Sequence, residues 1–369
     1  MGAIAVVAGA FLIILILWEA FEAIVLPRRV SRRLRLTRIF YRAMWRGWSA
    51  IGRRRRPGSR RENYLSIFAP LSFLLLLVMW AGGVILGFAL IQLGLGTPLA
   101  PEGQFGFGTY LYLSGTTFVT LGLGDVVPVS ATGRALTAVE GGAGFAFLAL
   151  VIAYLPVMYQ AFSRREVRIS MLDQWAGSPP SAVELLRRAG RHEGVASIDG
   201  LLSDWEYWSA ELLESHLSYP VLAYFRSQHD NQSWLSALTT ILDLSALALA
   251  GVEGVSGWQA RRTFAMARHA VVDLAHVFAT APEPPPADRL PSEEVPGLIK
   301  LLGGAGVRLD PHAEERLSQF RGMYEPYVHA LSRHLEMPLP PLLPPSEVVD
   351  NWRTSAWGSR DDASTPGRT

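Results

Sequence analysis

The sequence of 369 residues contains no cysteine, and this absence narrows the chemistry open to it. A chain without cysteine has no disulfide framework, no thiolate metal site and no cysteine nucleophile. Residues 164–336 also lack the Gly-x-Gly-x-x-Gly motif that follows the first strand of a dinucleotide-binding fold. Alternating strand patterns are scarce there as well, so we expect this part of the chain to be helical.

Long apolar runs are abundant, because half of the residues are hydrophobic. Three runs, at 3–26, 64–93 and 135–159, are long enough to cross about 30 Å of hydrocarbon as helices. The first run could instead be a cleaved signal peptide, but such peptides carry their positive charge before the apolar core. Here the charge follows the core, so we predict a transmembrane helix.

Basic charge is concentrated between the first two runs. Of the 34 basic residues, 14 are arginines between Arg28 and Arg61, and Glu62 is the acid that opposes them there. The flanking apolar runs favour a membrane-flanking loop over a nucleic-acid site, and we expect no nucleic-acid partner. Because such loops stay in the cytoplasm, we predict a multi-pass protein of the cell membrane with its N-terminus outside and its C-terminus in the cytoplasm.

The arginine-rich segment has the periodicity of an amphipathic helix. One face carries arginines at helical spacing, namely Arg35, Arg38, Arg42 and Arg46, and apolar residues occupy another face. This pattern predicts a helix at the membrane surface whose arginines contact anionic lipid headgroups. A voltage sensor is the alternative, but it sets its arginines within an otherwise apolar span.

Between the second and third runs, residues 108–128 form a helix-capable stretch that ends in alternating glycines. Gly122 and Gly124 permit the unusual dihedral angles with which a backbone can turn carbonyl oxygens toward a dehydrated cation. Thr120 adds a hydroxyl at the inner end and Asp125 a carboxylate at the outer mouth. A lone Gly-Leu-Gly-Asp motif is often only a turn, but its position between two spans favours a pore loop.

These residues resemble the signature of the potassium-channel superfamily, in its prokaryotic type with a two-helix pore domain. The resemblance is carried by Thr117, Thr120, Gly122, Leu123, Gly124 and Asp125. It implies an ion-coordinating filter at Thr120, Leu121, Gly122, Leu123 and Gly124. Leu121 and Leu123 stand where valine and tyrosine are commonest, so a non-selective cation channel is an alternative.

The resemblance also implies how the filter is assembled and supported. Each chain supplies one loop and a ring of carbonyls needs four, so we expect a homotetramer with K+ as the permeant ion and no cofactor. Thr117 and Asp125 would support the filter and its mouth. Glu140, inside the third run, is expected to face protein behind the filter, although local pairing near the outer interface is an alternative.

Other residues of the third run are candidates for a hinge or gate. Gly141, Gly142 and Gly144 could bend the helix or allow close packing, and we favour packing for at least one of them. Pro156 frees a carbonyl and bends the helix near its inner end, which fits a gate.

Beyond the third run the pattern changes to that of a helical globular domain. Helices are expected at 181–189, 198–217, 232–250, 256–280, 292–302 and 311–335. The stretch 234–250 is apolar enough for a fourth span, but Asp243 at its centre favours a buried helix. Proline-rich composition predicts a linker at 281–291 and a disordered tail at 337–369.

A metal site in this domain is a weaker hypothesis. His269, Asp273 and His276 share one helical face, and His229 with Asp230 forms a pair of the sort that metal-dependent helical hydrolases use. The chain has eight histidines, and a helical domain with that many produces such spacings by chance. If the site were real, the chain could be a membrane-anchored signalling or enzymatic protein with a vestigial pore, which is the alternative to the channel. We expect the channel and no enzyme.

Together these patterns predict an all-α membrane protein in five parts. The parts are an N-terminal transmembrane helix (1–27), an Arg-rich juxtamembrane helix (28–63), a pore domain (64–162), a cytoplasmic helical domain (163–336) and the tail (337–369). The pore domain divides into an outer helix (64–93), a re-entrant pore helix with filter (108–128) and an inner helix (134–160). The expected function is passive potassium transport.

Overall fold

The computed structural model describes residues 2–25, 35–103, 105–192, 194–229, 231–285 and 287–344. This described part of the chain is mostly helical, as expected of an all-α membrane protein, and its strands form one short antiparallel pair. Helices long and apolar enough to cross a membrane occur at Gly2–Ile24, Ser59–Gly94, Ala131–Ala176 and Trp234–Gly251.

The chain divides into two compact units. The first comprises Met1–Arg55 and Tyr64–Gln160, and the second comprises Arg56–Asn63 and Ala161–Thr369. A short piece that precedes the second membrane helix therefore belongs to the same unit as the C-terminal bundle.

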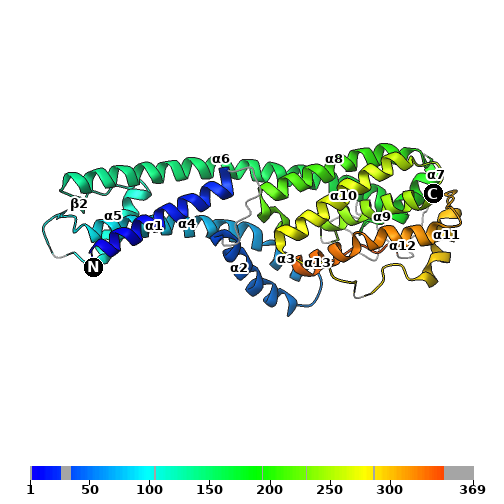
Figure 1. Cartoon of the computed structure of the whole chain (residues 1–369), viewed down its shortest axis with the longest axis horizontal. Coiled ribbons are helices and arrows are strands. Elements are labelled where there is room, and N and C mark those ends of the chain that lie inside the picture. Colours follow the sequence, from blue (N-terminus) through cyan, green and yellow to red (C-terminus); the bar gives the residue numbers. More distant parts are fainter. Residues whose placement is uncertain are drawn as a thin grey trace, which may run out of the picture. The chain divides into compact units, whose positions relative to one another are not determined.

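In the first unit, α1 (Gly2–Ala20), continued by η1 (Phe21–Val25), packs along α4 (Phe68–Gly94) (Figure 1). Glycines line the seam between them. A Cβ on Gly9 would lie 2.4 Å from the carbonyl oxygen of Gly87, and one on Gly94 would lie 2.5 Å from that of Gly2. Small residues that let backbones approach closely are a common basis of helix association in membranes.

The amphipathic helix expected from the arginine pattern is α2 (Leu36–Arg53). Its apolar face packs on aromatic residues: the Trp45 and Phe68 rings are 4.7 Å apart, and the Trp48 and Tyr64 rings stack at 4.6 Å. Its other face exposes arginine side chains, among them Arg42 and Arg46.

Carboxylates at the C-terminal end of α1 and in η1 hold the start of α2. Glu19 is buried and accepts hydrogen bonds from the backbone N–H and the hydroxyl of Thr37, at 3.2 and 3.0 Å. Arg35 lies 3.6 Å from the Glu22 carboxylate. An acceptor at the first turn satisfies N–H groups that have no partner within the helix. These acids therefore anchor the start of α2.

The inner helix α6 (Ala131–Ala176) is longer than the predicted 134–160. It passes through Pro156 and meets neither glycine nor proline until Gly177, whose φ of +78° ends it. The predicted end followed the loss of hydropathy after residue 160. Hydropathy marks the end of an apolar run, whereas the helix itself stops only at a residue that breaks it.

The second unit is a helical bundle. Its elements are α7 (Ala182–His192), α8 (Ser197–Ser218), η2 (Pro220–Tyr224), α9 (Trp234–Gly251), α10 (Gly257–Phe278), η3 (Ser292–Glu294), α11 (Val295–Gly303), α12 (Ala313–Gly322) and α13 (Glu325–Leu335). The predicted helix 311–335 is in fact two helices, because Pro326 lacks an N–H group and opens α13 in its first turn.

The apolar helix α9 forms the core of this bundle. It contacts α7, α8, α10, α12 and α13, and nearly all of its side chains are buried. A lipid-facing helix would leave an apolar surface exposed. The helix is therefore buried within the bundle, as predicted, while its position outside the membrane stays a prediction.

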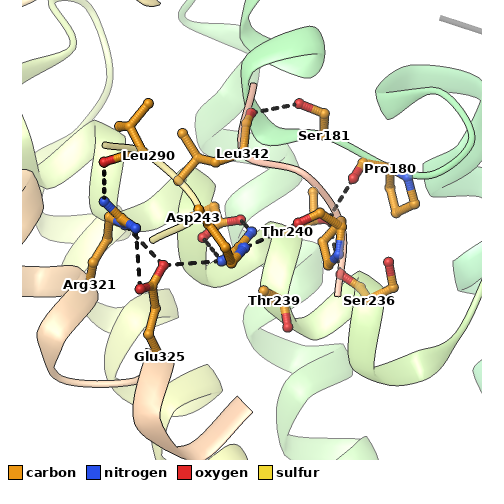
Figure 2. A network of polar contacts seen from close by, with 12 residues as sticks. Pro180, Ser181, Ser236, Thr239, Thr240, Asp243, Leu290, Arg321, Glu325 and Leu342 are labelled. Atoms are coloured by element: carbon orange, nitrogen blue, oxygen red, sulfur yellow. Dashed lines mark hydrogen bonds and ion pairs between the residues drawn. The ribbon is translucent and has the colours of Figure 1, made fainter. Parts of the chain in front are cut away.

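A buried polar network surrounds Asp243 at the middle of α9 (Figure 2). Its carboxylate binds the guanidinium of Arg289 and accepts a hydrogen bond from the Tyr324 hydroxyl. Arg289 also lies 3.3 Å from Glu325 and donates to the carbonyl of Pro340 at 3.1 Å. The linker and the start of the tail are thus held by one arginine.

The prediction of a disordered tail from residue 337 is wrong for residues 337–344. Met337 and Leu342 are completely buried, and the Ser181 hydroxyl donates to the carbonyl of Leu342 at 3.1 Å. Leu290 of the predicted linker is buried too. Proline limits helix and strand formation but does not prevent an irregular segment from burying its other side chains. Residues 345–369 lie outside the described residues.

Candidate functional site

The pore helix α5 (Phe107–Phe118) turns directly into the predicted filter. At the turn, the N–H groups of Leu121 and Gly122 donate to the carbonyl of Thr116 at 2.8 and 3.3 Å. The N–H of Thr120 donates to the carbonyl of Thr117 at 2.9 Å. Residues 120–124 therefore begin at the C-terminal end of α5, where the helix dipole is negative.

The backbone of the filter alternates in its conformation. Thr120, Gly122 and Gly124 have φ values of +57°, +54° and +78°, while Leu121 and Leu123 between them do not adopt positive φ. Gly122 and Gly124 tolerate this region without cost, because they carry no Cβ. Thr120 is the residue for which the conformation is unfavourable, by roughly 1–2 kcal/mol.

The outer end of the filter is tied to the pore helix. The Tyr112 hydroxyl donates to Oδ2 of Asp125 at 2.8 Å, and both side chains are accessible in the single chain. Asp125 directly follows Gly124, so this bond fixes the point at which the filter ends. Tyr112 was not among the predicted site residues, because its partner lies 13 positions away and no local spacing rule connects them.

A small scaffold surrounds the mouth. Strand β1 (Leu99–Ala100) pairs with β2 (Val127–Pro128), and the Tyr110 hydroxyl donates to the carbonyl of Thr97 at 2.8 Å. Gly133 at the start of α6 fits closely here, since a Cβ on it would lie 2.4 Å from the Thr97 side chain. The segments before α5 and after the filter are thereby fixed to each other.

Behind the pore helix, Glu140 of α6 is completely buried. Its Oε1 is hydrogen-bonded to the Ser114 hydroxyl of α5, and the same hydroxyl donates to the carbonyl of Ile85 in α4 at 2.8 Å. Glu140 therefore faces protein, as predicted, whereas its role in supporting the filter stays a prediction. Ser114 was missed, although a polar residue on an otherwise apolar pore-helix face is a signal that could have found it.

The glycines of α6 differ in their surroundings. A Cβ on Gly144 would lie 1.8 Å from the carbonyl oxygen of Phe118, so α6 approaches the end of the pore helix at this point. Thr117 is the nearest neighbour of Gly141, at 3.8 Å, and nothing lies within 4 Å of a Cβ on Gly142. The packing role expected of at least one glycine is confirmed for Gly144, while the hinge roles of the others and of Pro156 stay predictions.

Beyond residue 160, α6 is fixed within the second unit by Arg165. This buried guanidinium donates to the carbonyls of Leu222 and Phe225 at 2.8 and 2.9 Å and pairs with Glu166. It also lies 3.2 Å from Nε2 of His216. Burial, reinforced by the charge of Arg165, holds the pKa of His216 well below its usual value.

The segment next to these carbonyls also holds α3 (Ser59–Ser66). Arg226 lies 3.4 Å from Glu62 and donates to the carbonyls of Leu335 and Glu336 at 2.6 and 2.9 Å. Arg61 forms an ion pair with the Glu336 carboxylate. Residues 222–226 thus bind both the continuation of α6 and the approach to α4.

The proposed metal ligands do not assemble. His269 lies 3.3 Å from Asp273, but its side chain is largely exposed, and the described residues contain no group of three or more ligands suited to a metal ion. His276 does not complete a site, and Asp230, the neighbour of His229, lies outside the described residues. The enzyme hypothesis gains no support from these side chains.

Comparison with known proteins agrees with the geometry of the first unit. A family model described as "Ion channel" matches residues 73–161, which include α5, the filter and the adjoining parts of α4 and α6. No curated protein and no solved structure matches the chain. Residues 73–161 thus match a two-helix ion-channel pore domain that is potassium-channel-like.

Proposed function

We propose that the chain is one subunit of a potassium channel that conducts K+ passively through residues 120–124. The observation that supports this most directly is the alternation of φ along Thr120, Gly122 and Gly124. A backbone that alternates in this way can direct successive carbonyl oxygens to one side. Such oxygens replace the water shell of a dehydrated cation. The Thr120 hydroxyl would complete the innermost binding position.

The surroundings of the filter favour a cation. Its inner end adjoins the negative end of the α5 dipole, and its outer end carries the Asp125 carboxylate. Within residues 64–160 the charged side chains are Glu102, Asp125, Arg134 and Glu140. Because only one of these is basic, an anion pathway would find little to stabilise its ion here.

A homotetramer follows from the geometry of a carbonyl ring. One chain contributes a single strand of oxygens, whereas a dehydrated K+ ion needs oxygens on all sides. In the single chain, Leu121 and Leu123 are 60% and 61% exposed. Large apolar side chains at such positions are suited to contact with further copies of the chain, and fourfold symmetry closes the ring.

Selectivity for K+ over Na+ rests on how the filter is held. Leu123 has no hydroxyl, so its side chain offers no hydrogen bond to the surrounding protein. In this chain the bond from Tyr112 to Asp125 is the tie at the outer end. We propose that this tie and the α5 turn keep the filter at the spacing that suits K+.

The arginines of α2 suit the cytoplasmic surface of the cell membrane. With Arg42 and Arg46 exposed on one face, α2 would lie among anionic lipid headgroups. The positive-inside rule then places the N-terminus outside and the second unit in the cytoplasm. We assign the chain no cofactor and no enzymatic activity.

The test is flux through the purified protein in liposomes that contain K+, with either K+ or Na+ outside. Gly122→Asp should abolish the flux, because an L-residue at φ +54° is strained and relief of the strain would turn the carbonyl oxygens out of line. Gly108→Asp is the matched control. It places the same side chain in the first turn of α5, where nothing lies within 4 Å and a carboxylate is favourable.

Three results would be decisive. K+-selective flux that Gly122→Asp abolishes and Gly108→Asp preserves would support the proposal. Equal flux of K+ and Na+ would replace it with a non-selective cation channel. No flux at any tested pH, calcium concentration or voltage would contradict conduction and shift attention to the second unit.

A further inference from the structure

Glu140 poses a problem of hydrogen-bond donors. The Ser114 hydroxyl carries one proton, yet it lies within hydrogen-bond distance of two oxygens, the carbonyl of Ile85 and Oε1 of Glu140. A hydroxyl can donate to only one of them. The carbonyl oxygen of Ile85, at 2.8 Å, can only accept, so if the hydroxyl donates to it, the contact with Glu140 needs a proton on Glu140.

Among the described residues, no positive charge pairs with an ionised Glu140. Its hydrogen-bonded neighbours lie on α5 and, through Ser114, on α4, and α4 contains no ionisable residue. Three other hydroxyls of α5 are engaged elsewhere: Tyr110 with Thr97, Tyr112 with Asp125 and Thr116 with Leu113. The nearest basic residue along α6 in this unit is Arg134, whose Nε donates to the carbonyl of Pro128 at 3.2 Å.

The second oxygen of the Glu140 carboxyl group also lacks a donor in the part of the chain that the structure describes. Oε2 of Glu140 is buried and has no hydrogen-bond partner among the described residues. A buried carboxylate that lacks both a counter-charge and donors is very unfavourable, whereas a neutral acid leaves only one weak acceptor unsatisfied. If other copies of the chain packed against this site, the basic residue that their residues 64–160 could bring near Glu140 would be Arg134, because this stretch contains no other.

We propose that Glu140 is a protonated carboxylic acid that donates to Ser114 and acts as a positioning residue for the pore helix. The resulting chain of hydrogen bonds runs from Glu140 on α6 through Ser114 on α5 to Ile85 on α4. It therefore joins inner, pore and outer helices directly behind the filter. Loss of the proton would reverse the Glu140–Ser114 bond, release the carbonyl of Ile85 and leave a charge that the site cannot stabilise. This inference deepens the proposed channel function and rests on it for its effect on flux.

Infrared spectroscopy tests the proton itself. The difference spectrum between the wild-type protein and Glu140→Gln, both in lipid bilayers at neutral pH, should contain the carbonyl stretch of a protonated carboxylic acid. Ser114→Ala should shift that band to higher frequency, because it removes the partner. A spectrum that shows only a carboxylate band lost in Glu140→Gln would overturn the proposal.

Flux measurements test the positioning role. Gln can donate to Ser114 as a neutral acid does, so Glu140→Gln should retain the K+ to Na+ flux ratio of the wild type within about twofold. Glu140→Leu has a similar size but no donor, and it should lower that ratio by about tenfold, the effect of one lost hydrogen bond. Equal ratios in the two variants would overturn the role.

The two readouts separate this inference from the proposed function. If the wild-type protein carried no ions, the channel proposal would fail, while the infrared band would still report whether Glu140 holds a proton. If the protein conducted but the band were absent, the channel proposal would stand and this inference would fail.

Discussion

Tyr112 in the pore helix donates a hydrogen bond of 2.8 Å to the carboxylate of Asp125, the residue that follows the last glycine of the filter. The bond joins two accessible side chains 13 positions apart and ties the outer end of the filter to α5. Leu123 cannot form such a tie from within the filter, since its side chain has no polar atom. The bond from Tyr112 to Asp125 therefore fixes the outer end of the filter, which the apolar side chain of Leu123 cannot do.

Removing this tie should weaken ion selection. Tyr112→Phe deletes the hydrogen bond to the Asp125 carboxylate, at an accessible position where water competes for both groups. We expect the K+ to Na+ flux ratio in liposomes to fall by roughly threefold to tenfold. Tyr207→Phe, on an exposed tyrosine of α8, is the control and should leave the ratio unchanged. A Tyr112→Phe ratio equal to the wild type would show that the tie does not bear on selectivity.

The two neighbouring glycines of α6 should respond differently to the same change. Gly144→Ala would place a methyl group 1.8 Å from the carbonyl oxygen of Phe118, so α6 and α5 must separate. Gly142→Ala meets no atom of the chain within 4 Å and replaces a poor helix former. We expect thermal unfolding in detergent to occur several degrees lower for Gly144→Ala and close to the wild-type temperature for Gly142→Ala. The reverse order would mean that Gly142 faces another subunit more tightly than Gly144 faces α5.

Acid should destabilise the second unit through His216. Its neutral ring is buried, with Nδ1 2.9 Å from the carbonyl of Leu212 and Nε2 facing the Arg165 guanidinium. Burial and Arg165 lower its pKa in the folded protein, so below the usual value of about 6.5 only the unfolded chain takes up the proton. The free energy of unfolding should therefore fall by up to about 1.4 kcal/mol for each pH unit below that value.

Matched histidine variants test the source of this slope. His216→Gln keeps an acceptor for Arg165 and should flatten the dependence of the unfolding temperature on pH between neutral and mildly acidic conditions. His192→Gln, at an exposed position, should leave the slope unchanged. Some slope should persist in His216→Gln, because burial also lowers the pKa of His329. An unaltered slope in His216→Gln would show that another group takes up the proton.

Removing Arg289 should cost far more than removing a surface arginine. Arg289→Ala leaves Asp243 buried without its cation, a change that typically costs about 3–5 kcal/mol. Arg308→Ala breaks an ion pair whose side chains are 80% and 57% exposed, and such pairs contribute about 0–1 kcal/mol. Thermal unfolding gives the two values, and limited proteolysis should cut residues 337–344 faster in Arg289→Ala alone. Similar losses in both variants would contradict the role given to the network.

The membrane helices and the filter could be predicted because their signals are local. An apolar run of sufficient length, or a pair of glycines at alternate positions, determines the structure of the residues that form it. Gly122 and Gly124 are cases in which residue type and conformation agree, whereas the positive φ of Thr120 is not signalled by its residue type. Helix α9 could be assigned to a protein core because Asp243 interrupts its apolar surface.

Features that depend on distant partners could not be predicted in this way. The bond from Ser114 to Glu140 joins residues 26 positions apart, and the bond from Ser181 to Leu342 spans 161 positions. No periodicity or spacing rule reports such pairs. The length of α6 was missed for another reason, since the pattern that identified it records contact with lipid and not helical conformation.

The exposed apolar side chains of the filter have a genetic consequence. In the proposed tetramer, Leu121 and Leu123 of all four chains would form part of one filter, so no single chain forms a complete ion pathway. A damaged filter in one chain would then disable its three intact neighbours. If mutant and normal chains mixed at random in equal amounts, about one tetramer in sixteen would contain four intact chains. A mutation in the filter would therefore act as a dominant-negative mutation.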